Sequence, residues 1–523
     1  MGIAFTAPHS KAAQAGMEIL RQGGNAVDAM IAGAAAVSVL YPHMTGLGGD
    51  GFWLIQRPGE APFALDASGF AGEKATLNFY QGEEVIPSRG PKAAITVGGA
   101  VGGWQVARTW AEAAGMRSLP LETLFAEAIR YAEEGIEVSE SLAEASKMTF
   151  ADLSKFDDFS DLFSDQGHPL QKGETFLNPA LSRLLKTLAK NGLSDFYQGS
   201  VGRTIASHLQ AVGSPLTSAD LQNYRAQPME VLKHEISHGW LFNVGAPTQG
   251  LASILILAIY DRLYQADWNE AQSVHYLIEA IKQAFLIRDR VIADPSRVEG
   301  ELQPYLSEEQ LQACIAAIDP DKALAWPQIA EPGDTVWMGC VDRDGTMVSY
   351  IQSLYWEFGS GVVIPAFGLL WNNRGTSFSL QPGHRNVLQP GMKPFHTLNP
   401  AFCEFRDGRR MAYGTMGGEG QPQTQAALFS RYAYQNADLA EAISDARWLL
   451  GRTWGDQQHD LKLEESLFER VGDVLQSLGH SMQCLPDLSE RMGHAGAVVA
   501  YPSGACSAAS DPRSNGGAFA EYS

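Results

Sequence analysis

Cysteine is scarce in this sequence of 523 residues, and the few that occur lie far apart. The five are Cys314, Cys340, Cys403, Cys484 and Cys506. Their number is odd, and no pair has the close spacing of a redox motif or of zinc ligands. The sequence therefore predicts no disulfide framework, which fits a reducing compartment.

Basic residues are also in deficit. Lys and Arg together number 38, against 59 Asp and Glu, which gives a formal net charge of -21. Because the phosphates of nucleic acids attract Lys and Arg, we expect no nucleic-acid partner. Such a charge is typical of a surface that keeps a protein in solution.

Long apolar runs are missing as well. The most apolar early stretch, residues 30–40, is too short to cross a bilayer. Residues 1–15 contain no basic segment followed by an apolar one, as a secretory signal would. We therefore expect no membrane partner and a cytoplasmic protein.

Several familiar catalytic motifs are absent. There is no H-E-x-x-H pair, no Walker loop and no G-x-S-x-G elbow. The histidines His275, His384, His396 and His480 are scattered, and none has a ligand partner at helical spacing. We therefore expect no metal and no cofactor. A Ser-His-Asp triad stays open, because its members need not be close in the chain.

A glycine-rich stretch at residues 43–51 stands between a predicted helix at 26–40 and a predicted strand at 52–55. A dinucleotide fingerprint needs the order strand, glycines, helix, so the sequence disfavours nucleotide binding. The helix at 26–40 is apolar on nearly every side, which predicts that it is buried. Asn25 is typical of its N-cap.

Periodicity and turn residues predict the remaining elements. Further helices are expected at 10–21, 118–135, 178–191, 202–212, 251–263, 273–291, 307–317 and 422–434, and strands at 63–67, 93–97, 337–341, 346–355, 362–364, 369–371, 401–405 and 410–413. Residues 160–173 are acidic and expected to be exposed, and residues 294–333 suit a surface connection that tolerates a break. Helices early and strands late favour an α+β protein with helices packed on antiparallel sheet.

Thr335 follows that connection and begins a predicted strand. A Thr hydroxyl is a weak nucleophile unless a base lies within reach, and its own α-amine can be that base if the Asp334–Thr335 bond is cut. The α-amine has a reference pKa of about 7.7–8.0, so it is partly unprotonated near neutral pH. Gly417 and Gly418, in a turn before a predicted helix, could offer backbone N–H groups to an oxyanion. The ordinary alternatives are a Thr at the start of a buried strand and a tight strand-to-helix turn.

Short motifs along the chain connect Thr335 with the glycine turn at Gly417 and Gly418. From about residue 12 to residue 513, the chain resembles the γ-glutamyltransferase family of N-terminal nucleophile hydrolases. The motifs, in family order, are GNAVDA at 24–29, GLGG at 46–49, TVWMGCVD at 335–342, FGSG at 358–361, NN at 372–373 and GG at 417–418, followed by SDPR at 510–513.

The resemblance implies a fold and a maturation step. The fold is an αββα sandwich, in which two stacked, largely antiparallel sheets are flanked by helices. A zymogen cuts itself before the nucleophile into residues 1–334 and 335–523, which stay associated as a heterodimer in one intertwined domain. A dimer of such heterodimers is a further assembly that this resemblance allows.

The resemblance also assigns residues to the reaction. Thr335 takes the position of the nucleophile, and Gly417 and Gly418 take that of the oxyanion hole. Apart from the resemblance, we expect Ser353 to be a strand hydroxyl that orients the Thr335 amine; the alternative is an ordinary polar residue of a strand.

Several positions depart from the family pattern. Val336 and Trp337 replace the usual Thr-His after the nucleophile. Leu77 replaces the Arg that holds the α-carboxylate of a γ-glutamyl group, and Ser377 replaces the acid that holds its α-amine. His396-Thr397 replace a Ser-Ser pair, and Tyr355 replaces an Asn. Losing both the Arg and the acid leaves a zwitterionic head without partners, and burying it unpaired costs several kcal/mol. A γ-glutamyl substrate is therefore disfavoured.

A different substrate contact is expected beside the Asn pair. Arg374 follows Asn373, and an Arg fork suits a carboxylate, although an outward-facing surface Arg is the alternative. A short loop at 380–392 suits water as acceptor. We predict hydrolysis of a small carboxylate-bearing amide to acid and ammonia, as in the family branch that includes oxamate amidohydrolases. The substrate would contact Asn373, Arg374, His396, Thr397 and Tyr355.

Three alternatives accompany this prediction. One is a γ-glutamyl hydrolase or transferase, and another is an enzyme of the cephalosporin-acylase type. The third is an uncleaved, non-catalytic binding protein with the same fold.

Overall fold

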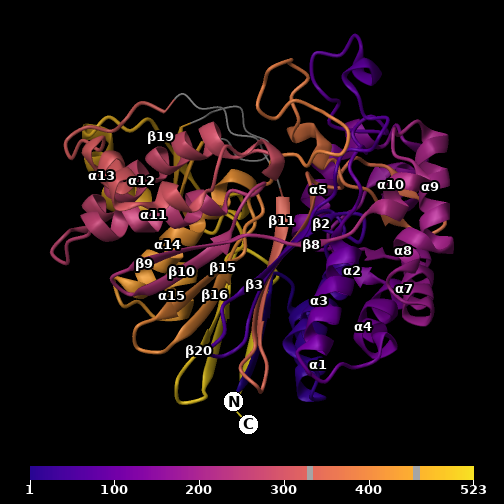
Figure 1. Ribbon diagram of the computed structural model, residues 1–523, viewed down its shortest axis with the longest axis horizontal. Coiled ribbons are helices and arrows are strands. Elements are labelled where there is room, and N and C mark those ends of the chain that lie inside the picture. Colours follow the sequence, from indigo (N-terminus) through magenta and orange to yellow (C-terminus); the bar gives the residue numbers. More distant parts are fainter. Residues whose placement is uncertain (327–333, 452–459, 523) are drawn as a thin grey trace.

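Two β-sheets lie face to face, and each is covered on its outer side by helices (Figure 1). The computed structural model describes residues 1–326, 334–451 and 460–522. Every pair of neighbouring strands in the two large sheets of this part is antiparallel. The αββα sandwich predicted from the sequence is confirmed.

The strands of both sheets follow a fixed order across the molecule. The first sheet runs β22 (Gly517–Glu521), β1 (Ile3–Ala7), β11 (Asp334–Val341), β12 (Met347–Tyr355), β2 (Asp50–Gln56), β3 (Phe63–Ala67) and β8 (Gln227–Pro228). The second runs β21 (Cys506–Ser510), β20 (Gly496–Ala500), β16 (Arg410–Gly414), β15 (Ala401–Phe405), β10 (Gly239–Val244) and β9 (Val231–Ile236). Each sheet thus combines strands that precede Thr335 with strands that follow it.

Three apolar layers hold the sandwich together. One lies between the sheets and includes Trp337, Ile351, Phe402 and Val498. The outer face of the first sheet packs against α1 (Ser10–Arg21), α2 (Ala26–Leu40) and α3 (Ala100–Ala113), and α4 (Leu121–Glu134) packs on α2. The outer face of the second packs against α11 (Gly250–Leu263), α14 (Gln421–Ala433) and α15 (Leu439–Ser444). Helix α12 (Glu270–Val291) packs on α11 and α14, and α16 (Glu465–Ser477) packs on α12.

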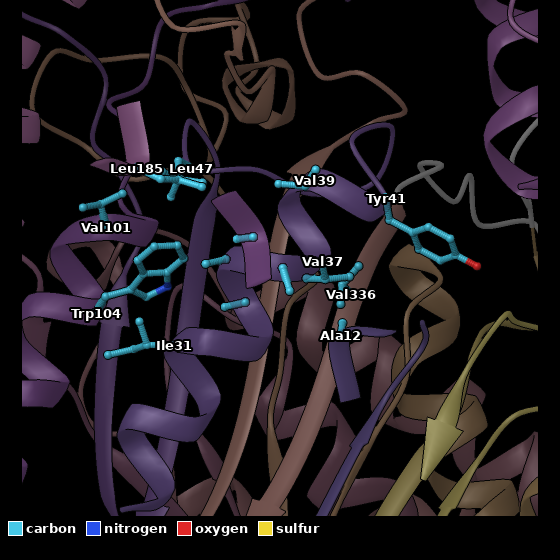
Figure 2. Close-up of a cluster of buried hydrophobic side chains, with 14 of the residues drawn as sticks. Ala12, Ile31, Val37, Val39, Tyr41, Leu47, Val101, Trp104, Leu185 and Val336 are labelled. Carbon is cyan, nitrogen blue, oxygen red and sulfur yellow. The ribbon is translucent and has the colours of Figure 1, made fainter. Parts of the chain in front are cut away.

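Successive side chains of strand β11 point to opposite faces of its sheet. Figure 2 shows Val336 among the side chains of the helical layer, beside Val37 of α2. Trp337 belongs to the layer between the sheets, and its indole donates to Ser349 Oγ at 3.0 Å. The two apolar residues that follow Thr335 are therefore used to pack the strand on both of its faces.

The helices closest to the site begin and end where the sequence predicts. Residues 10–21 and 26–40 are α1 and α2, and every residue of α2 is buried. The side chain of Asn25 caps α2 by accepting from the backbone N–H of Asp28 at 2.9 Å. Helix α14 lies within one residue of the predicted range at each end.

Other sequence predictions are wrong or incomplete. No strand forms at 93–97, where Thr96 makes only an isolated bridge to Ala71. The Thr96 carbonyl accepts from the Trp371 indole, so this backbone group is not available for a β-ladder, and the Thr96 hydroxyl donates to Asn372. Phe163, expected to be exposed, is buried against Phe358. Strands β1, β9 and β10, helix α3 and all elements after residue 434 were not predicted.

The connection before Thr335 is described only in part. Its predicted helix is α13 (Glu308–Ala316), while residues 327–333 lie outside the described residues. Among the described residues, we find no helix with the length and apolarity needed to cross a membrane.

Candidate active site

Thr335 lies at a break in the ladder between β11 and β12. Asp334 pairs with Tyr355 and Val336 pairs with Gln352, so the register shifts at Thr335. A bulge of this kind re-aims the side chain of the residue that it releases. The Thr335 side chain is buried, with the residue 1% exposed.

A chain of side-chain amides leads from Thr335 into the second layer of helices. Gln421, the first residue of α14, donates from Nε2 to Thr335 Oγ1 at 3.4 Å. Asn399 donates in turn to Gln421 Oε1 at 3.3 Å, and Gln425 donates to the Asn399 carbonyl at 2.9 Å. Neither Gln421 nor Asn399 was predicted from the sequence.

The predicted oxyanion turn joins β16 to α14. Gly417 has φ 115° and Gly418 has φ 54°, both in the left-handed region that glycine adopts at little cost. Gly417 precedes and Gly418 begins a short 3-10 helix (η5, Gly418–Gly420) that leads into α14, and the first backbone N–H groups of such a helical start lack helical partners. The turn therefore has the backbone form that the prediction requires.

A buried polar group holds this turn from behind. Gln249 Nε2 donates to the carbonyls of Gly418 at 2.9 Å and of Thr397 at 2.6 Å. Arg288 donates to Gln249 Oε1 at 3.0 Å and to Glu419 Oε2 at 2.6 Å. The glycine turn and the segment at Thr397 are thereby fixed to each other, by two residues that the sequence analysis missed.

Ser353 lies near the end of β12, beside the strand of Thr335. It is fully buried, and its hydroxyl accepts from the backbone N–H of Tyr355 at 2.7 Å. Tyr355 has φ 85°, a conformation that a bulky side chain rarely adopts and that is typical of functional sites. This turn of the backbone places the Tyr355 ring under Arg374.

Arg374 points inward, so the alternative of a surface Arg is wrong. It is fully buried, and its guanidinium carbon lies 3.8 Å from the centre of the Tyr355 ring. Its Nη1 donates to Thr397 Oγ1 at 3.4 Å. An aromatic face stabilises a cation, and a planar fork can bind a carboxylate with two N–H groups.

Asn373 is engaged by the protein at both ends of its amide. Its Nδ2 donates to the Ser88 carbonyl at 3.0 Å, and its Oδ1 accepts from the Trp356 N–H at 3.1 Å. These bonds position the loop that carries Arg374.

His396 stands next to Thr397 and opposite a residue that was not predicted, Asp50. His396 Nε2 lies 4.0 Å from Asp50 Oδ2, and both residues are fully buried. Burial lowers the pKa of His396 well below 6.5, and the charges of Arg374 and Lys393 lower it further. Burial raises the pKa of Asp50 from 3.8 to about 7, against the opposing effect of Arg374.

The two positions that depart most from the γ-glutamyl pattern carry no charge. Leu77 begins a short 3-10 helix (η1, Leu77–Tyr80) and is 39% exposed. Ser377 ends another (η4, Arg374–Ser377).

One buried cluster away from this site has metal-ligand residue types. His275 and Glu279 lie four residues apart on α12, so the prediction that no His has a ligand partner at helical spacing is wrong for His275. Possible ligand atoms of His275, Glu279 and His480 lie within 4.8 Å of one another. Lys282 donates to Glu279 Oε1 at 2.6 Å, however, so a cation already neutralises the carboxylate.

Comparison with known proteins gives a consistent result. The chain matches the family Gamma-glutamyltranspeptidase over residues 12–521. It is 50% identical over 512 residues to the oxamate amidohydrolase proenzyme of Klebsiella pneumoniae, a match that covers 98% of this chain and 97% of that protein. It is 35% identical over 517 residues to the glutathione hydrolase-like YwrD proenzyme of Bacillus subtilis, with 98% and 97% covered.

A solved structure agrees in fold over nearly the whole chain. The cephalosporin acylase from Bacillus halodurans superimposes with a TM-score of 0.88 at 30% sequence identity, covering 99% of this chain and 95% of that one.

Proposed function

This chain belongs to the gamma-glutamyltranspeptidase family and is an N-terminal nucleophile hydrolase of amide bonds, and we propose that it cleaves a small carboxylate-bearing amide of the oxamate type. The products are the dicarboxylic acid and ammonia. Its similarity to an oxamate amidohydrolase proenzyme supports this substrate class.

The buried position of the Arg374 guanidinium is the main observation in support of this substrate class. Its guanidinium is buried on the Tyr355 ring and beside the Thr397 hydroxyl. A buried cation supported on one face by an aromatic ring suits a compact anion. A γ-glutamyl group would need an anionic partner for its α-amine as well, and Ser377 carries no charge at that position.

Processing creates the nucleophile in this proposal. The cut between Asp334 and Thr335 gives a heterodimer of residues 1–334 and 335–523, and the uncut chain is the zymogen. Because both sheets take strands from each segment, the two remain one intertwined unit.

The reaction then has two steps. The α-amine of Thr335, oriented by Ser353, accepts the hydroxyl proton as Oγ attacks the amide carbon. Backbone N–H groups of Gly417 and Gly418 donate to the oxyanion. The C–N bond breaks, the proton passes to the leaving nitrogen, and ammonia departs.

Water completes the turnover. It attacks the resulting Thr335 ester, the amine again accepts a proton, and the C–O bond to Thr335 breaks. For oxamate the sum is oxamate plus water giving oxalate and ammonium.

The test uses the whole protein and two variants. The wild type should give two bands on a denaturing gel, with Thr335 at the N-terminus of the smaller fragment, and should release ammonia from oxamate. Thr335→Ala should stay a single band of 56.6 kDa without activity. Thr335→Ser, which keeps a hydroxyl, should still be cut.

Two results would contradict parts of the proposal. A wild type that remains a single band, with Thr335→Ala equally active, excludes Thr335 as nucleophile. Turnover of a γ-glutamyl anilide without ammonia release from oxamate would favour the γ-glutamyl alternative.

A further inference from the structure

Two buried polar groups face each other beside Arg374. Among the residues that the structure describes, Asp50 Oδ2 and both ring nitrogens of His396 have no hydrogen-bond partner. The gap of 4.0 Å between Asp50 Oδ2 and His396 Nε2 is too long for a hydrogen bond. Because an unsatisfied buried polar group costs about 1–3 kcal/mol, such atoms call for a function.

The position of Asp50 follows from the pairing of three strands. Asp50 begins β2 and pairs with Ser353 of β12, and β12 pairs with β11 at its Thr335 end. The carboxyl group therefore lies at the same end of the sheet as the hydroxyl of Thr335, two strands away.

Both groups are held firmly in place. The Gly69 N–H donates to Asp50 Oδ1 at 2.9 Å, which fixes the carboxyl group and directs Oδ2 away from that bond. The His396 backbone bonds to Pro247 and Gln249, and the Phe52 ring packs edge-on against the imidazole at 5.0 Å. This rigidity is typical of a preorganised binding site.

The chemistry of the pair selects a ligand with two N–H groups on one atom. Burial and the neighbouring cations keep His396 neutral, so its ring offers a lone pair. Asp50 Oδ2 offers a second lone pair when the carboxyl group is ionised, which its pKa of about 7 allows at and above neutral pH. A nitrogen placed about 2.9 Å from each acceptor can donate one N–H to both, since each of these distances is that of an ordinary hydrogen bond.

We propose that Asp50 Oδ2 and His396 Nε2 bind the nitrogen of a primary amide, and the ammonia that it becomes, while Arg374 binds the carboxylate at the other end of the substrate. The inference rests on the proposed function and deepens it, because it restricts the enzyme to primary amides. An alkyl group on the nitrogen would remove one N–H and leave one buried acceptor without a donor.

Three compounds with the same acyl group test the subsite. Oxamate has two N–H groups, N-methyloxamate has one, and monomethyl oxalate is an ester with none. For the wild type, kcat/KM for N-methyloxamate should be at least about 100-fold below that for oxamate, while monomethyl oxalate is hydrolysed.

A variant isolates the contact. Asp50→Asn keeps the size of the side chain but turns an N–H donor toward the substrate N–H. It should lower kcat/KM for oxamate about 10- to 100-fold and leave monomethyl oxalate within about twofold. His396→Gln should show the same selectivity to a smaller degree, because the amide retains an acceptor.

Asp28→Asn is the matched control. Asp28 is a buried carboxylate at the start of α2 that accepts from the Leu119 N–H, and this end of α2 touches Asp342 at the far end of β11. It should not change the ratio of the rates on the amide and the ester.

The possible failures are distinguishable. Equal loss on oxamate and monomethyl oxalate in Asp50→Asn, or wild-type cleavage of N-methyloxamate at the rate of oxamate, overturns the subsite and leaves the proposed function standing. A self-cleaved wild type that releases no ammonia from oxamate overturns both. If Asp50→Asn fails to fold, the comparison of oxamate with N-methyloxamate on the wild type decides.

Discussion

The side-chain amide of Gln421 lies 3.4 Å from the hydroxyl of Thr335, although 86 residues separate them in the chain. The contact connects the bulged start of β11 to the first residue of α14. Asn399 holds the other end of the same amide. The orientation of the Thr335 hydroxyl is therefore coupled to the helix that follows the glycine turn.

Replacement of Gln421 by Leu should lower kcat about 10-fold or more without preventing folding, because the hydroxyl loses a donor that orients it. Gln423→Leu is the control: the hydrogen bonds of this buried amide go to the Leu450 backbone through both of its ends and to the Glu419 carbonyl at 3.4 Å. It should lower Tm and leave kcat unchanged. Equal kcat values in the two variants would exclude a positioning role for Gln421.

Gly417→Ala should reduce turnover more than its effect on stability explains. A Cβ at Gly417 would meet only the Gly493 Cα, at 3.7 Å, so the strain comes from φ 115° and costs about 1–2 kcal/mol. Relief of that strain rotates the N–H groups assigned to the oxyanion, and loss of one such donor costs about 100-fold or more in kcat.

The control for this change lies on the surface at the end of α9 (Ser200–Val212). Gly213 has φ 96° and open space around its Cα. Gly213→Ala should shift Tm comparably while kcat stays at the wild-type value. Parallel losses of kcat in both variants would contradict the assignment of Gly417.

Arg374→Gln should weaken the use of anionic substrates selectively. A charge-assisted hydrogen bond contributes about 1.5–3 kcal/mol, so kcat/KM for oxamate should fall about 10- to 150-fold. Oxamide, in which an amide replaces the carboxylate, should lose less than about threefold. The ratio of the two kcat/KM values in wild type and variant is the measurement, and an unchanged ratio would exclude Arg374 as the carboxylate partner.

Asp50→Asn should stabilise the protein increasingly as pH rises. Burial raises the pKa of Asp50 to about 7, with Asp66 raising it too and Arg374 and Lys393 opposing. The unfolded chain ionises near 3.8 whereas the folded chain keeps the proton, so this carboxyl group stabilises the fold fully below about pH 4 and loses that effect as pH rises to about 7. Burial lowers the pKa of His396 well below 6.5, so this ring favours its neutral form as well.

The size of this effect follows from the pKa difference. About three pKa units correspond to an effect on the order of 4 kcal/mol. The measurement compares the Tm of Thr335→Ala with that of Thr335→Ala combined with Asp50→Asn, from pH 5 to pH 8. Both chains are uncut, so the Tm difference reports the effect of Asp50→Asn alone. Three nearby buried tyrosines do not titrate here, because burial raises their pKa values: Tyr197, Tyr224 and Tyr350. A Tm difference that does not change with pH would contradict the prediction.

Local signals allowed the sequence to predict α1, α2 and α14 closely. Asn25, Gly135 and the glycines before α14 mark helix ends through their own backbone preferences, which act over a few residues. Strands β9 and β10 were missed because they alternate weakly, with Lys233 and Glu235 exposed and Asn243 buried. Strand β10 pairs with β15, more than 150 residues away, and β9 pairs with β10.

The same contrast holds for the candidate site. Thr335, Gly417 and Gly418 were predicted because short motifs occur in a recognisable order, and Ser353 was predicted as a hydroxyl on a neighbouring strand. Asp50 could have been found, since a carboxylate beside a buried strand after a glycine-rich turn is unusual. Four further residues could not be predicted from local sequence patterns, because they contact residues that are distant in the sequence: Gln249, Arg288, Asn399 and Gln421.

The sharing of both sheets by segments on either side of Thr335 has a consequence for the lifetime of the enzyme. The uncut chain folds as one molecule, so all strands are present at a high effective concentration. After the cut, recovery from unfolding would require two separate chains to meet and interleave thirteen strands of the described sheets, seven and six, a bimolecular search in competition with aggregation. We therefore expect the mature enzyme to be kinetically stable, with a half-life set by its unfolding rate, and heat inactivation to be reversible only before processing.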